Sequence, residues 1–159
     1  MGINGDLYQF VEVLHILAAI VGFGGMLIAG FYGEEARKRP GREGLAIAET
    51  TLTVTGKVPT VAVYTVPVLG ILLIFLSDDA FKFSQAWVSA SFALYFVLIG
   101  LSVGVQVPAV RKMVALRASE DGAASAEMRG LGKKVAAVSG IVNLLWVVTL
   151  FLMVFKPGA

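Results

Sequence analysis

Four long apolar stretches, separated by polar segments, dominate the pattern along this chain of 159 residues. They cover residues 7–32, 58–76, 87–107 and 135–155. Each reaches about 20 residues, and an α-helix of that length, rising about 1.5 Å per residue, crosses a hydrocarbon core about 30 Å thick. Because lipid offers the backbone no hydrogen-bond partners, each stretch is expected to be helical. The pattern predicts an all-α fold, a four-helix transmembrane bundle with short loops, in which residues 1–159 form a single integral membrane domain.

The composition supports this membrane assignment. Hydrophobic residues make up 57% of the chain and charged residues only 15%, and the mean hydropathy is +0.83. A soluble chain of this length needs more polar surface than that. The formal net charge of +2 is too small to indicate nucleic-acid binding, and the lack of cysteine excludes disulfides, thiolate catalysis and cysteine-based metal sites. The expected surroundings are therefore a lipid bilayer, with no nucleic-acid partner.

Lysine and arginine residues are concentrated in two of the polar segments. Residues 33–57 contain five and residues 108–134 contain six, whereas the remaining polar segments contain two in total. By the positive-inside rule, the two basic segments face the cytoplasm and both termini face outward. The segments are interpreted as topology signals with ordinary attraction to anionic lipid. We expect a multi-pass protein of the bacterial cytoplasmic (inner) membrane.

The first apolar stretch contains the only histidine of the chain, His15, one helical turn from Glu12. Counting onward by three and four residues reaches a line of small residues: Ala18, Gly22, Gly25 and Ala29. Residues at this spacing share one face of a helix, and small residues allow a neighbouring backbone to approach closely. This face is therefore predicted to point into the bundle. With the N-terminus outside, His15 would lie about 5–10 Å below the outer surface.

Polar residues of the other three stretches are expected to complete a partly polar bundle interior. The candidates are Tyr64 in the second stretch, Ser91 and Tyr95 in the third, and Asn143 in the fourth. In one interpretation these groups bond to one another and set the helix register, at about 0.6–2 kcal/mol for each hydrogen bond. In the other, an ionisable group at membrane depth marks a ligand, an ion path or a proton relay.

His15 is the candidate cofactor ligand, and His15 with Glu12 is the candidate metal-binding pair. Imidazole suits iron, copper and haem iron. One histidine without cysteine cannot form a bis-histidine haem site or a histidine-rich metal site within one chain. A second ligand would come from Met153, a tyrosine, a lysine or His15 of a second subunit. No catalytic residue is predicted, and the sequence leaves open whether the protein is an enzyme.

The pattern LHILAAIVGFGGML, residues 14–27, resembles the first span of a group of small bacterial four-helix membrane proteins. The group includes the CopD copper-resistance domain, HemJ-type protoporphyrinogen oxidases and a family of predicted integral membrane proteins without an assigned function. Trp87 and the prolines of the second stretch fit the last family best. The HemJ resemblance implies haem ligation by His15, and the CopD resemblance implies copper handling. HemJ-type proteins also carry a third-span lysine, which this chain lacks.

Three functional classes remain open from the sequence. The first is a haem- or metal-associated membrane protein centred on His15, with haem b or copper as the cofactor. The second is a small transporter or channel-like protein with a polar path through Asn143, Tyr64, Tyr95 and His15. The third is a structural or accessory subunit of a larger membrane complex, or a homo-oligomer, in contact through the small-residue face.

Overall fold

The computed structural model describes residues 2–39, 41–118 and 126–158, which are helical nearly throughout and contain no strand. The helices are α1 (Asp6–Lys38), α2 (Gly41–Thr55), α3 (Val58–Leu76), α4 (Ala86–Leu101), the π-helical segment η1 (Ser102–Gln106), α5 (Val107–Ala118) and α6 (Ala126–Phe155). Four helical stretches are long and apolar enough to cross a membrane: α1, α2 with α3, α4 through α5, and α6. The prediction of an all-α four-helix transmembrane bundle is confirmed.

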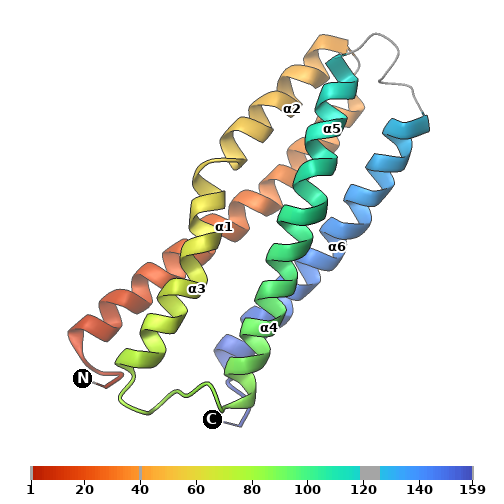
Figure 1. Ribbon diagram of the computed structural model, residues 1–159. Coiled ribbons are helices and arrows are strands. Elements are labelled where there is room, and N and C mark those ends of the chain that lie inside the picture. Colours follow the sequence, from red (N-terminus) through yellow and green to blue (C-terminus); the bar gives the residue numbers. More distant parts are fainter. Residues whose placement is uncertain (1, 40, 119–125, 159) are drawn as a thin grey trace.

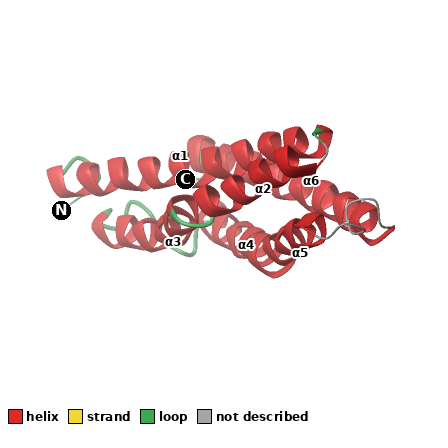
Figure 2. Cartoon of the chain, turned by 90° about the horizontal axis from the view of Figure 1, so that it is seen from above, coloured by secondary structure: helices red, strands yellow, loops and turns green. Residues whose placement is uncertain are grey.

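The helices form an elongated bundle with both termini at the same end (Figure 1). The turn between α3 and α4 lies at that end too, whereas α2, α5 and the start of α6 lie at the other (Figure 1). Contacts divide the bundle into two helical hairpins, because α1 packs mainly on α3 and α2 while α4 packs on α6. The view from above shows the four long helical stretches side by side (Figure 2). The end that faces the cytoplasm is assigned from the distribution of lysine and arginine.

The helices extend well past the predicted spans at the end opposite the termini. α1 has 33 residues and is therefore about 50 Å long, about 20 Å more than a hydrocarbon core. The basic segments 33–57 and 108–134, predicted to connect the spans, are themselves largely helical where they are described. Residues 119–125, which belong to the second segment, lie outside the described residues. The bundle therefore continues as helices beyond the membrane on one side.

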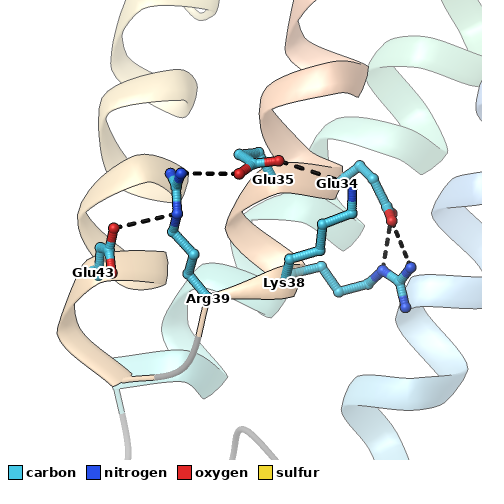
Figure 3. Close-up of polar contacts among 6 residues, drawn as sticks. Glu34, Glu35, Lys38, Arg39 and Glu43 are labelled. Carbon is cyan, nitrogen blue, oxygen red and sulfur yellow. Dashed lines mark hydrogen bonds and ion pairs between the residues drawn. The ribbon is translucent and has the colours of Figure 1, made fainter.

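Ion pairs at helical spacing stabilise this polar end. Arg37 pairs with Glu34 at 2.6 Å, and this hydrogen bond lowers the pKa of the Glu34 carboxyl. Arg39, in the turn after α1, lies between Glu35 and Glu43 at N–O distances of 3.0 and 3.2 Å (Figure 3). Such pairs at a spacing of three or four residues support an exposed helix face. Burial contributes as well, because Ala36 of α1 and Ala109 of α5 are 2% and 6% exposed. Ion pairs and packing together therefore accompany helix where the sequence suggested a loop.

The core lies at mid-height between the four spans. Its buried members are Val63 and Val66 of α3, Tyr95 and Leu98 of α4, and Val142 and Trp146 of α6. Many large apolar side chains instead face outward, among them Phe10, Phe75 and Phe151, which are 61%, 74% and 53% exposed. Water would penalise so much exposed apolar surface, whereas lipid accepts it. The outer surface is therefore that of a protein embedded in a bilayer.

Candidate functional site

His15 lines a small cavity that all four spans help to enclose. The cavity measures about 20 Å³, enough for about one water molecule. Its walls come from His15 of α1, Val66, Pro67 and Gly70 of α3, Ser91, Phe92 and Tyr95 of α4, and Met153 of α6. The cavity lies nearer the termini than the apolar core, in the half of the bundle that the sequence predicts to be outer.

The small residues of α1 bring this helix close to α3. A Cβ atom added at Gly22 would lie 3.0 Å from Cγ2 of Val63, and one added at Gly25 would collide with the ring of Pro59. The prediction that this face packs closely on a neighbouring helix is confirmed at these two glycines. On α3, Gly70 makes room in turn for the imidazole, because a Cβ atom there would lie 3.3 Å from Cε1 of His15. Gly70 of α3 therefore leaves the space that the imidazole of α1 occupies.

Nδ1 of His15 is buried, and within the described residues it has no hydrogen-bond partner. Leaving a buried polar atom unpaired costs about 1–3 kcal/mol, and lipid provides no water to compensate. The two hydroxyls of the cavity do not relieve this cost, because their hydrogens are used elsewhere. Ser91 donates to the Trp87 carbonyl at 2.7 Å, and Tyr95 donates to the Val63 carbonyl at 2.5 Å. The unpartnered Nδ1 of His15 is therefore the main polar feature of the cavity.

The bond from Tyr95 follows from the proline in the middle of α3. Proline has no N–H group, so Pro67 cannot donate to the carbonyl four residues earlier, which is that of Val63. In a membrane this carbonyl needs another donor. The hydroxyl of Tyr95, which is 4% exposed, supplies it from α4. Pro67 and Tyr95 thus form one structural unit that joins the two hairpins beside the cavity.

Two of the four residues expected inside the bundle lie outside it. Ser91 and Tyr95 are buried, but Tyr64 is 47% exposed and Asn143 is exposed as well, which corrects the expectation for both. The reason is the angular position of these residues around the helix axis. The inward face of α3 is formed by Val63, Val66, Pro67 and Gly70, and that of α6 by Val142, Trp146, Thr149 and Met153. Tyr64 and Asn143 each follow directly after an inward-facing residue in the sequence, and one step along an α-helix turns a side chain by about 100°.

Glu12 is not one of the residues that line the cavity. It is half-buried one turn from His15, and the described residues contain no group of three or more histidine, aspartate and glutamate side chains that could hold a metal ion. The structure therefore brings His15 together with Met153 rather than with Glu12. Gly70, Phe92 and Val66 were not predicted as site residues. Val66 and Gly70 lie three and seven residues after Val63, and this helical spacing is a signal that could have identified them.

The polar path that a channel would need is interrupted. Of its four predicted members, Tyr64 and Asn143 face outward. The apolar core lies on the side of the cavity away from the termini. Its members Val63, Leu98 and Val142 are only 3%, 0% and 2% exposed. Apolar side chains therefore separate the cavity from the polar end of the bundle in this conformation.

The comparisons with known proteins agree with the membrane architecture. Residues 9–157 match the family described as "Predicted integral membrane protein (DUF2269)". No curated protein matches the chain, and no solved structure matches it.

Proposed function

Since the chain belongs to the DUF2269 family of predicted integral membrane proteins, and so spans a lipid bilayer several times, we propose that it binds one soft monovalent metal cation, of the Cu⁺ class, in the His15 cavity. One observation carries this proposal. The unpartnered Nδ1 of His15 is buried at a cavity that the Met153 side chain also lines. His15 and Met153 would be the two ligands, one from α1 and one from α6.

The donor set determines which kind of ion fits. A thioether is a soft ligand that selects Cu⁺, and imidazole binds copper as well. Hard divalent cations such as Mg²⁺ and Ca²⁺ need several oxygen ligands, and no carboxylate lines the cavity. A monovalent ion also brings less charge into a low-dielectric site than a divalent ion does. The residues present therefore favour Cu⁺ over the common hard cations.

Haem b does not fit the same site. The cavity of about 20 Å³ holds one ion or one water molecule, whereas ligand pockets for larger cofactors measure about 300–1,000 Å³. His15 remains a possible haem ligand by chemistry alone, but the side chains around it leave no room for the macrocycle. No haem-dependent step is therefore assigned to this chain.

The position of the cavity indicates how the ion would be used. In a bacterial cytoplasmic membrane with both termini outside, the cavity lies toward the outer face. The apolar core separates it from the opposite end, so the arrangement favours capture or transfer of an ion at one face over conduction through the bundle. Transfer to a second membrane protein would combine metal binding with an accessory role in a complex.

Competition for Cu⁺ with the chromophoric chelator bicinchoninate, under reducing conditions, tests this proposal on the purified protein. We expect one Cu⁺ per wild-type chain. Met153→Leu keeps the volume of the side chain but removes the sulfur, and should weaken binding at least about tenfold, since even loss of groups that only support metal ligands costs about 10–100-fold. Met26→Leu is the matched control, because Met26 packs on the apolar core and not on the cavity. Wild-type protein that takes up no Cu⁺, or equal losses in the two variants, would contradict the proposal.

A further inference from the structure

A second hollow lies on the outside of the bundle between α1 and α3. It is a groove of about 640 Å³, lined by Leu17 and Val21 of α1, by Val61, Ala62 and Thr65 of α3, and by Lys57 at the junction of α2 and α3. It shares no lining residue with the His15 cavity. Val61 is 66% exposed and Leu17 is 50% exposed, so the groove opens toward the surrounding lipid.

The groove has an apolar body and one charged end. From Lys57 to Thr65 it follows α3 over eight residues, which is about 12 Å along the helix. Val61 and Ala62 form its wall on that helix, and Leu17 and Val21 form the opposite wall on α1. Lys57 immediately precedes the first residue of α3. At this position, the start of an apolar span, a lysine ammonium reaches the level of the lipid headgroups.

The charge of Lys57 is not matched within the groove. The side chain is exposed, no acidic residue is among the residues that line the hollow, and no ion pair of Lys57 is found in the part of the chain that the structure describes. Three basic residues at the end of α1 differ, because Arg37, Lys38 and Arg39 each pair with a glutamate. Lys57 therefore presents a free cation directly above an apolar groove.

We propose that this groove binds one anionic phospholipid from the leaflet in which Lys57 lies. The ammonium group of Lys57 contacts the lipid phosphate, and one acyl chain lies between α1 and α3 against Leu17, Val21 and Val61. The volume is within the range of about 300–1,000 Å³ typical of small-molecule sites. Basic pockets between transmembrane helices on the cytoplasmic side are suited to anionic headgroups. Charge complementarity favours the lipid as the occupant, because a phosphate neutralises Lys57 in a groove that has no acidic lining residue.

Native mass spectrometry of the detergent-solubilised protein tests this site, with phosphatidylglycerol and phosphatidylcholine of identical acyl chains as probes. We expect one phosphatidylglycerol per chain, retained about fivefold better than phosphatidylcholine, because one lysine near the surface contributes about that factor. Lys57→Gln should remove the preference. Arg42→Gln is the control, since it removes an equally exposed positive charge from the first turn of α2, outside the groove, and it should leave the preference unchanged.

A second variant tests the apolar part of the site without changing charge. Val61→Trp fills the groove from an exposed position that tolerates a larger side chain, and should reduce the binding of both lipids. Glycerophosphoglycerol, which has the headgroup but no acyl chain, should not displace the bound lipid. The proposal is overturned if Lys57→Gln retains the wild-type preference, if Val61→Trp binds lipid normally, or if the acyl-free headgroup competes fully. It is also overturned if the groove mediates a lipid-free dimer that Val61→Trp dissociates.

Discussion

Gly25→Leu is expected to cause the largest loss of stability of any single substitution between α1 and α3. Even a Cβ atom at this position would overlap the ring of Pro59, and Pro59 itself is buried at the start of α3. Neither side can yield easily, because a proline ring is rigid and both helices are fixed by their other contacts. Overpacking of this kind costs about 3 kcal/mol. Reversible unfolding by sodium dodecyl sulfate in mixed micelles, followed by circular dichroism, would measure the change in the free energy of unfolding.

The neighbouring glycine provides the control for this prediction. A Cβ atom at Gly24 would meet nothing within 4 Å, so Gly24→Leu adds the same side chain to the same helix without a collision. Because leucine also has the higher helix propensity by up to about 1 kcal/mol, this variant should be as stable as the wild type or slightly more stable. Similar losses in both variants would show that α1 does not pack on α3 as described.

Tyr95→Phe is expected to lower stability by about 1–3 kcal/mol, the cost of leaving a buried carbonyl without a partner. The carbonyl concerned is that of Val63, which Pro67 cannot satisfy within α3 and which the Tyr95 hydroxyl satisfies from α4. The substitution removes only the hydroxyl oxygen, so the packing of the ring is retained. The same unfolding measurement applies.

The cause of this loss can be isolated with a second substitution. Pro67→Ala restores an N–H group at the position from which an α-helix would bond to the Val63 carbonyl. In that background, Tyr95→Phe should cost much less, so the two substitutions should be coupled by about 1 kcal/mol or more in a double-mutant cycle. Strictly additive effects would mean that the hydroxyl of Tyr95 does not replace the bond lost at Pro67.

The sequence predicted the four spans because their signal is strong and local. About 20 apolar residues in a row suffice to indicate a membrane helix, whatever the neighbouring helices do. The helical extensions beyond the membrane have no such signal. They are held by packing at Ala36, which is 2% exposed, and by ion pairs such as Arg39 with Glu35. Arg117 of α5 also donates to the Ala36 carbonyl of α1, at 2.5 Å. The bond from Arg117 joins residues far apart in sequence, so no local pattern indicates it.

The candidate site was predicted less well because of a property of membrane helices. In water, polar residues mark the outer face of a helix, but a nearly uniformly apolar helix shows little difference between its faces. Small residues at regular spacing gave the correct inward face of α1, since Gly22 and Gly25 contact α3. No comparable marker exists on α3 or α6, and polarity alone placed Tyr64 and Asn143 wrongly. The link between Pro67 and Tyr95 required the relative position of two helices, which single-sequence reasoning does not provide.

X-ray absorption spectroscopy of the Cu⁺-loaded protein tests the central claim most directly, because it identifies the atoms that contact the ion. The proposed site predicts one sulfur and at least one nitrogen ligand in the wild type. It further predicts loss of the sulfur signal in Met153→Leu, retention in Met26→Leu, and loss of bound copper in His15→Ala. Copper surrounded only by nitrogen or oxygen in the wild type, or a sulfur signal that persists in Met153→Leu, would contradict the assignment of the His15 cavity as a soft-metal site.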